Sequence, residues 1–239
     1  MRRVYSKDER GRTYYELDEA QRKLIDIYRP ERPICNTTFV IDMTEIDSLR
    51  KEGKAPFSLY SFILKAAADT LANFPILGGR WEGKDKIICS PQGEADIGGP
   101  IQVGDTIGFF WIERANQRNL PEISEILMRN LSEARSGRAG WGDRSVKKPG
   151  MVVSNVGTIG EVDWGSGPVA SFSTSILGIC AVMEKTKVIE GQIQIRKLMN
   201  AVLLWDHRAM MANTSVEFLT EFKRRLENPL LLWEESSRP

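Results

Sequence analysis

Histidine is almost absent from this sequence: His207 is the only one among 239 residues. A single imidazole rules out metal sites built from two or three histidines. Imidazole is also the one side chain whose unperturbed pKa suits it to accept protons near neutral pH. Any general-base chemistry that depends on imidazole must therefore take place at His207. The competing interpretation is a structural histidine at the end of a buried strand.

Cysteine is scarce as well. Cys35, Cys89 and Cys180 are odd in number, far apart and set in apolar stretches. This pattern argues against a disulfide framework or a zinc site and indicates reduced thiols in a cytoplasmic protein. The first residues contain no apolar segment of the secretory type, and no apolar run approaches the roughly 20 residues of a membrane-spanning helix. We therefore expect neither a signal peptide nor a membrane anchor.

An excess of charge of one sign is missing too, because the formal net charge is +1. A protein with so small a net charge has no broad positive electrostatic potential that would favour binding to nucleic acid or to an anionic membrane. One local basic stretch, residues 135–148, contains Arg144, Lys147 and Lys148. These three are candidates for contacting the phosphates of a ligand, although such a stretch is more often a solvated loop.

Hydrophobic periodicity predicts a single domain in which helices and strands are mixed. Helical spacing of apolar residues marks 17–28, 59–74 after a Ser58 N-cap, 120–134, and a last helix that follows capping-box spacing at 214–217. Strands are expected at 37–41, 81–89, 94–103, 106–112, 151–154 and 171–183, followed by a hairpin over 187–195 and a strand ending near 205. Several strands adjacent in sequence favour an α/β two-layer sandwich over a doubly wound sheet, with residues 1–16 as a polar arm.

Two segments carry the chemistry. One is Val153-Ser154-Asn155-Val156-Gly157, and the other, about fifty residues later, is Trp205-Asp206-His207-Arg208. A serine hydroxyl at a strand end can donate to a developing oxyanion, and a histidine at another strand end can take a proton from a thiol or hydroxyl. Because neither segment contains a nucleophile elbow or a cysteine beside the histidine, the serine is interpreted as a stabiliser and not as a nucleophile.

From about Asn36 to Pro229 the chain resembles the catalytic domain of the dihydrolipoamide acyltransferases, the E2 subunits of 2-oxoacid dehydrogenase complexes. These enzymes share a superfamily with chloramphenicol acetyltransferase. The resemblance rests on the first strand and helix start at 38–45, a Lys-Ala-containing helix at 61–68, the segment 73–78 with Trp81, a Ser-Asn-x-Gly-x-x-Gly turn at 154–160 and the Asp-His-Arg start at 206–208.

The resemblance implies a chloramphenicol acetyltransferase-like mixed sheet flanked by helices, assembled as a homotrimer with each active site between two subunits. His207 would deprotonate the acyl acceptor, and Ser154 of the neighbouring subunit would stabilise the tetrahedral oxyanion, with Asn155 and Asp206 in support. Coenzyme A would enter along the interface as co-substrate, and no metal would take part.

Two departures from the family pattern affect the site. Met211 stands where the family has an aspartate, and Ala212 where it has glycine; Asn213 is a possible polar substitute. The family's Pro-Val-Ile-Arg strand reads Phe110-Trp111-Ile112-Glu113, in which the two aromatic residues either narrow the channel or simply belong to the core.

The sequence shows no lipoyl domain, peripheral subunit-binding domain or flexible linker. It therefore predicts a stand-alone acyltransferase that moves an acetyl or short acyl group between coenzyme A and a small-molecule or carrier-bound hydroxyl or thiol. Acetylation of a tetronate intermediate in a biosynthetic pathway is one such reaction. The alternative is a non-catalytic trimeric scaffold or partner subunit of a larger complex.

Overall fold

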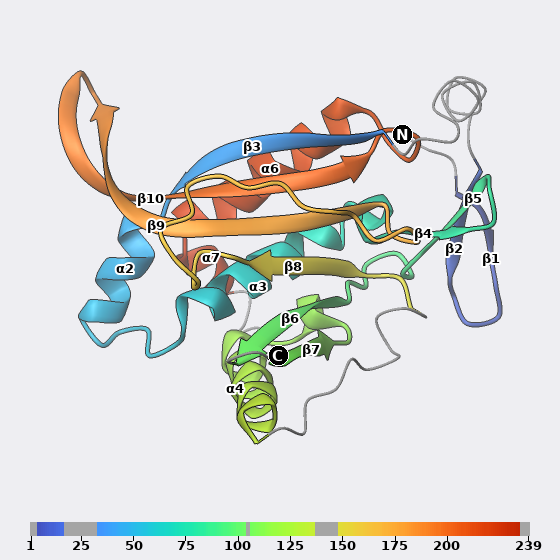
Figure 1. The fold of residues 1–239 in the computed structure, drawn as a ribbon, viewed down its shortest axis with the longest axis horizontal. Coiled ribbons are helices and arrows are strands. Elements are labelled where there is room, and N and C mark those ends of the chain that lie inside the picture. The colour runs from blue at the N-terminus through green and yellow to red at the C-terminus, as the bar shows by residue number, and fades with distance from the viewer. Residues whose placement is uncertain (1–3, 17–32, 104–105, 137–147, 235–239) are drawn as a thin grey trace.

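The computed structural model describes residues 4–16, 33–103, 106–136 and 148–234, and it contains two sheets with helices packed on one face of the larger sheet (Figure 1). The larger sheet has the order β3-β10-β9-β8-β6-β7. Its strands are β3 (Ile34–Asp42), β6 (Ile97–Val103), β7 (Thr106–Ile112), β8 (Met151–Asn155), β9 (Ser175–Ile189) and β10 (Gln192–Asp206). β8 runs parallel to β6 and β9, whereas the other pairs are antiparallel. The mixed sheet confirms the predicted α/β class.

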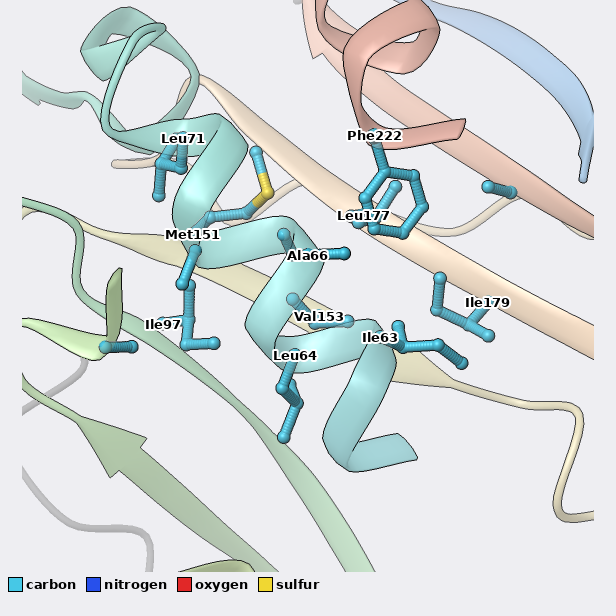
Figure 2. Close-up of a cluster of buried hydrophobic side chains, with 14 of the residues drawn as sticks. Ile63, Leu64, Ala66, Leu71, Ile97, Met151, Val153, Leu177, Ile179 and Phe222 are labelled. Carbon is cyan, nitrogen blue, oxygen red and sulfur yellow. The ribbon is translucent and has the colours of Figure 1, made fainter. Parts of the chain in front are cut away.

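The main core lies between this sheet and helix α3 (Leu59–Leu71), which Figure 2 shows crossing over β8 and β9. Ser58 caps the helix as predicted, because its side chain accepts from the Ser61 N–H. Ile63 and Ala66 meet Val153 and Leu177 of the strands beneath, and all are at most 1% exposed. Burial of this apolar face supplies the main driving force for folding, and it leaves no freedom for β8 to shift.

Further helices complete the layer. They are α2 (Thr44–Lys51), α4 (Leu120–Arg135), α6 (Ala212–Glu227) and α7 (Leu230–Glu234), with short 3₁₀ turns at Pro75–Gly78 and Ala115–Gln117. α4 begins with a capping box between Asn119 and Glu122. Within the described part of the chain, no helix has both the length and the apolar character required to cross a membrane.

A second sheet, β1-β2-β5-β4, lies at one end of the molecule (Figure 1). It contains β1 (Val4–Lys7), β2 (Thr13–Glu16), β4 (Arg80–Glu82) and β5 (Lys86–Cys89). Residues of the N-terminal arm thus pair with β5. The single strand predicted at 81–89 is wrong: it is a hairpin, since Gly83 has a φ of 69° in the turn between β4 and β5.

The predicted helix at 17–28 is not tested by the structure, and the predicted start of the last helix is corrected by it. The helix predicted at 17–28 lies outside the described residues. The capping box predicted at 214–217 is wrong, because α6 already begins at Ala212 and takes Met211 as its N-cap. Ser215 instead donates to the Ala212 carbonyl and pairs with Thr37 of β3 at 2.8 Å. Tertiary contact with β3, and not local capping chemistry, has set the start of this helix.

β9 and β10 form the predicted hairpin, which is long and extends past α2 at the end of the sheet opposite the second sheet (Figure 1). Glu190 and Gly191 have φ values of 50° and 80°, as in the tight turns that suit twisted hairpins. Glycine adopts this left-handed backbone without strain, whereas for the glutamate the same conformation costs a modest amount of conformational energy.

Asp42, at the end of β3, ties the hairpin to the body of the protein. Its carboxylate accepts hydrogen bonds from Arg196 Nε at 2.9 Å, Lys187 Nζ at 3.1 Å and Thr44 Oγ1 at 2.6 Å, and Asp42 is only 6% exposed. Burial alone would raise its pKa, but these hydrogen bonds outweigh burial and lower the pKa to about 2.

This pKa makes the stability of the protein depend on pH. Because the carboxylate is favoured in the folded state, its contribution is complete above the unfolded pKa of 3.8 and is lost as the pH falls through about 2. Asp42→Asn should therefore lower the free energy of unfolding by about 2 kcal/mol at pH 7 and by much less near pH 2. Urea unfolding followed by circular dichroism at both pH values measures this difference.

The matched control is Asp47→Asn, which removes an exposed ion pair with Lys51. It should change stability little at either pH. Equal destabilisation by Asp42→Asn at pH 7 and pH 2 would show that the ion cluster is not the source of the effect.

Candidate active site

His207 follows directly after β10, in a turn at the end of the sheet. Its backbone N–H donates to the Pro33 carbonyl at 2.9 Å, which continues the pairing of β10 with β3 by one position. Its ring lies against Trp205, with 5.1 Å between ring centroids, and the residue is half-buried. The backbone contact thus fixes the position of the residue and Trp205 packs against its ring, whose Nδ1 is buried, while the residue as a whole remains partly exposed.

The turn that carries His207 is held by an ion pair. Asp206 is 0% exposed and accepts from Arg208 Nε at 2.9 Å, Arg208 Nη2 at 2.6 Å and the Arg208 N–H at 3.0 Å. The guanidinium also stacks over Trp81 of β4, 5.0 Å from the ring centroid. A two-point Arg–carboxylate contact fixes orientation as well as charge. Asp206 therefore shapes the turn around His207 and does not face a ligand.

Ser154 lies near the end of β8, opposite Gly178 of β9. Its neighbour Val153 is 0% exposed in the core, so strand alternation turns Ser154 toward the face without helices. Tyr60 on α3 donates to the Val153 carbonyl at 2.8 Å, and a Cβ at Gly99 would come within 2.2 Å of that oxygen. β8 is thus held closely from both sides.

The turn after Ser154 is equally constrained. Val156 and Gly157 donate to the Ile179 carbonyl at 3.0 and 3.2 Å. A Cβ at Gly157 would lie 2.4 Å from the backbone of Cys180, so only glycine fits there. Asn155, half-buried, accepts from Thr158 through its carbonyl. This packing explains the glycine in the Ser-Asn-x-Gly segment.

The sheet keeps Ser154 and His207 apart within one chain. On β9, Ser154 is level with Gly178, and His207 follows a strand whose Trp205 is level with Ser175. The two are therefore separated by roughly 16 Å along the strands and by two strand spacings, roughly 10 Å, across the sheet. β8 and β10 also point in opposite directions (Figure 1). A single chain cannot bring both side chains to one acyl group.

The structure places the two aromatic residues of the altered strand on opposite faces of β7. Phe110 is 0% exposed and makes an edge-to-face contact with Tyr60, which favours its interpretation as a core residue. Trp111 packs over Gly98 and Gly150, where any Cβ would clash with its ring at 2.3–2.4 Å. The glycines have thus made room for Trp111 beside the sheet.

The remaining predicted residues lie at the surface or outside the described part. Met211 and Asn213 are exposed at the start of α6. Lys148 is exposed and forms an ion pair with Glu113, and Arg144 and Lys147 fall outside the described residues. Within the ranges that the structure describes, no group of three His, Cys, Asp or Glu side chains could hold a metal ion.

Sequence reasoning missed Cys35. It lies directly opposite Trp205 on β3 and diagonal to His207, and it is half-buried. Burial raises the pKa of its thiol, and the nearby charge of Asp206 raises it further. No local pattern around Cys35 indicates this position, since it follows only from the register of β3 against β10.

Comparison with known proteins adds a family match. Residues 24–233 match the family model of the 2-oxoacid dehydrogenases acyltransferase (catalytic domain). The chain is 30% identical over 205 residues to the dihydrolipoyllysine-residue succinyltransferase component of the 2-oxoglutarate dehydrogenase complex of Rickettsia typhi. That match covers 81% of this chain and 49% of the relative, so the chain spans about half the length of the curated relatives it matches.

Solved structures share the fold. A probable dihydrolipoamide acetyltransferase from Listeria monocytogenes matches with a TM-score of 0.72 at 21% identity, covering 93% of this chain and 96% of that one. A chloramphenicol acetyltransferase matches with a TM-score of 0.59 at 10% identity, covering 95% and 99%. These matches confirm the fold expected from the sequence.

The start of α6 provides a test of the altered motif. Met211 occupies the N-cap with extended backbone angles of −101° and 164°, and its side chain makes no capping hydrogen bond. Asp or Asn at an N-cap accepts from a free helix N–H and typically adds about 1 kcal/mol. Met211→Asp should therefore raise the free energy of unfolding by about 1 kcal/mol in urea titrations.

Met211→Ala serves as the control, because alanine cannot cap either, and it should leave stability nearly unchanged. An aspartate variant no more stable than the alanine variant would contradict the assignment of position 211 as the N-cap.

Proposed function

Because the chain belongs to the 2-oxoacid dehydrogenases acyltransferase (catalytic domain) family, we propose that it transfers a short acyl group between coenzyme A and a thiol or hydroxyl acceptor. His207 acts as general base, and Ser154 of a second copy stabilises the oxyanion. The observation that carries this proposal is the placement of the two residues. Each is half-exposed at the end of a rigid strand, yet one chain cannot bring them together.

The reaction needs only these groups and the two substrates. The imidazole of His207 takes the proton of the acceptor S–H or O–H as the acceptor attacks the acyl carbonyl. The carbonyl oxygen becomes an oxyanion, to which the Ser154 hydroxyl donates a hydrogen bond. The tetrahedral intermediate then collapses, and the departing thiolate of coenzyme A receives the proton from the imidazolium. The C–S bonding electrons leave with the thiolate, and His207 returns to its neutral form. The reaction therefore consumes no reagent besides the two substrates.

The surroundings of His207 suit this role. A base is effective when its ring is held in one orientation before the substrate arrives. Trp205 supports one side of the ring, and the Asp206–Arg208 pair braces the turn through Trp81. The charge of Asp206 is satisfied within the turn, so the imidazole is left to exchange protons with the acceptor.

We propose two alternative acceptors. Relatives are named for transfer to dihydrolipoyllysine, which makes a carrier-bound dithiol one acceptor to test. A small-molecule hydroxyl, as in a biosynthetic acetylation, is the other. The proposed assembly is the homotrimer that the family resemblance implies. A head-to-tail contact between the Ser154 region of one copy and the His207 region of the next is compatible with such a closed ring.

A non-catalytic scaffold is the second candidate function. Met211 favours it, because a thioether cannot replace the carboxylate that the family motif carries there. The two candidates differ in one readout, since a scaffold would assemble but would not turn over acetyl-coenzyme A.

Substitution of the two proposed residues tests catalysis. His207→Ala should lower kcat by roughly 10²–10⁴-fold, and Ser154→Ala by roughly 10²–10³-fold, with assembly unchanged. Release of free coenzyme A from acetyl-coenzyme A, with dihydrolipoamide and then small alcohols as acceptors, measures the rate. Turnover that survives His207→Ala would overturn the assignment of the base.

Mixing the two inactive variants tests whether the site is shared. If subunits of His207→Ala and Ser154→Ala reassemble at random in equal amounts, one interface in four pairs an intact serine with an intact histidine. Activity should therefore return to roughly a quarter of the wild-type value. Mixed oligomers verified by mass spectrometry that stay inactive would rule out a site formed between copies.

A further inference from the structure

A tryptophan of the second sheet contacts the turn that carries His207. This residue is Trp81 on β4, a strand that lies where the second sheet meets the end of the larger one (Figure 1). Trp81 is half-buried against the main core, and its indole Nε1 is buried without a hydrogen-bond acceptor among the described residues. A buried N–H that gains no partner is a cost, so Trp81 contributes through its ring face.

The turn around His207 is closed by the residue that precedes it. The Asp206 carboxylate accepts from the backbone N–H of Arg208 at 3.0 Å, and the Asp206 carbonyl accepts from the Ala209 N–H at 2.9 Å. Arg208 Nη2 donates to the same carboxylate at 2.6 Å. His207 therefore sits inside a turn whose shape depends on the Arg208 side chain staying on Asp206.

Arg208 has an alternative to this pairing. A long side chain loses rotamer entropy when it is held in one place, and its own side chain is 17% exposed, so water is within reach. The ring of Trp81 lies under the guanidinium, 5.0 Å from its carbon, and such a contact strengthens as the cation is desolvated. Trp81 thus favours the paired orientation of Arg208 over a solvated one.

The backbone of β4 is tied to the same turn. The Gly79 carbonyl accepts from the Thr174 N–H at 3.0 Å, and the Thr174 carbonyl accepts from the Asp206 N–H at 2.9 Å. Next to this link, the Trp81 N–H donates to the Phe172 carbonyl at 2.7 Å. Two routes therefore join β4 to the turn, one through the backbone and one through the stacked guanidinium, and the tryptophan ring keeps a fixed place beside it.

We propose that Trp81 is a positioning residue for the base. It holds Arg208 on Asp206, and through that pair it keeps the turn in the shape that orients His207. The inference rests on the proposed function where it takes His207 as the base. Because an oriented base matters in the transition state and not in substrate binding, loss of Trp81 is expected to lower kcat and to leave KM nearly unchanged.

The single histidine allows a first test that needs no acyl transfer. In the full chain, His207 gives the only histidine Cε1–Hε1 signal in NMR spectra and the only imidazole for diethyl pyrocarbonate to modify. Trp81→Leu keeps apolar bulk but has no ring face. It should shift or broaden that signal and raise the rate of modification roughly threefold or more, because the ring is held less firmly.

Kinetics of acetyl transfer from acetyl-coenzyme A supply the second test. Trp81→Leu should lower kcat roughly tenfold and change KM by less than about twofold. Trp81→Phe keeps a ring face and should restore most of the rate. Arg208→Lys keeps the charge but loses the planar fork, so it should cause a similar loss. Adding Trp81→Leu to Arg208→Lys should cost little more, because the link is already broken.

Phe172→Leu is the matched control. Phe172 is half-buried as Trp81 is, and it carries a guanidinium of the same strand, that of Arg80, at 5.4 Å from its ring centroid. This contact does not lead to Asp206. The control should therefore leave the histidine signal, the rate of modification and kcat as in the wild type.

Three results would overturn the inference. One is a folded Trp81→Leu variant with an unchanged histidine signal, rate of modification and kcat. Another is an equal loss in Phe172→Leu, which would indicate general loosening of this end of the sheet. If Trp81→Leu does not fold by circular dichroism, Arg208→Lys decides instead, and an unchanged histidine signal in that variant is the third.

Failure of the proposed function would look different. A wild type without acyl transfer, whose histidine signal still responds to Trp81→Leu and recovers in Trp81→Phe, would support the positioning of His207 and refute the chemistry. An active enzyme indifferent to Trp81→Leu would refute the role of Trp81 and leave the acyl transfer standing.

Discussion

The pairing of β9 with both β8 and β10 is the constraint on which the rest of this structure depends. β8 runs parallel to β9 and β10 antiparallel, so the residues that end β8 and β10 are placed at different levels of the sheet. Ser154 and His207 are such residues. Backbone hydrogen bonds of a core sheet do not slip, because a shift by one residue would turn every apolar side chain outward. The proposal that the site is completed between copies rests on this register.

Charged groups in this protein serve mainly to hold geometry. Asp206 and Arg208 are paired at the turn beside His207, and Asp42 anchors the hairpin through Lys187 and Arg196. Each carboxylate is nearly or completely buried, and each is satisfied by several donors, as buried charges must be. The result is two rigid features, a braced turn and a projecting ribbon.

Local signals predicted much of the fold. Ser58 begins α3, and the hairpin turn falls at Glu190 and Gly191 as expected, because caps and tight turns depend on residues that are neighbours in sequence. The capping-box spacing at 214–217 gave a wrong helix start, since Ser215 is engaged with Thr37 from a distant strand. From the sequence, the aromatic pair at 110–111 could either narrow the channel or belong to the core. The position of Trp111 depends on Gly98 and Gly150, which are distant in sequence.

The sequence by itself indicated which residues are candidates for catalysis and determined which family the chain resembles, because a lone histidine after a strand and a serine before a glycine turn are local patterns. Only the tertiary structure decided that these residues stand apart in one chain, that Cys35 pairs with Trp205 two positions before His207, and that the more exposed face of the hairpin carries its apolar residues. Each of these depends on strand register and sheet order. Those are set by side-chain packing and backbone hydrogen bonds between segments distant in sequence, which no local pattern encodes.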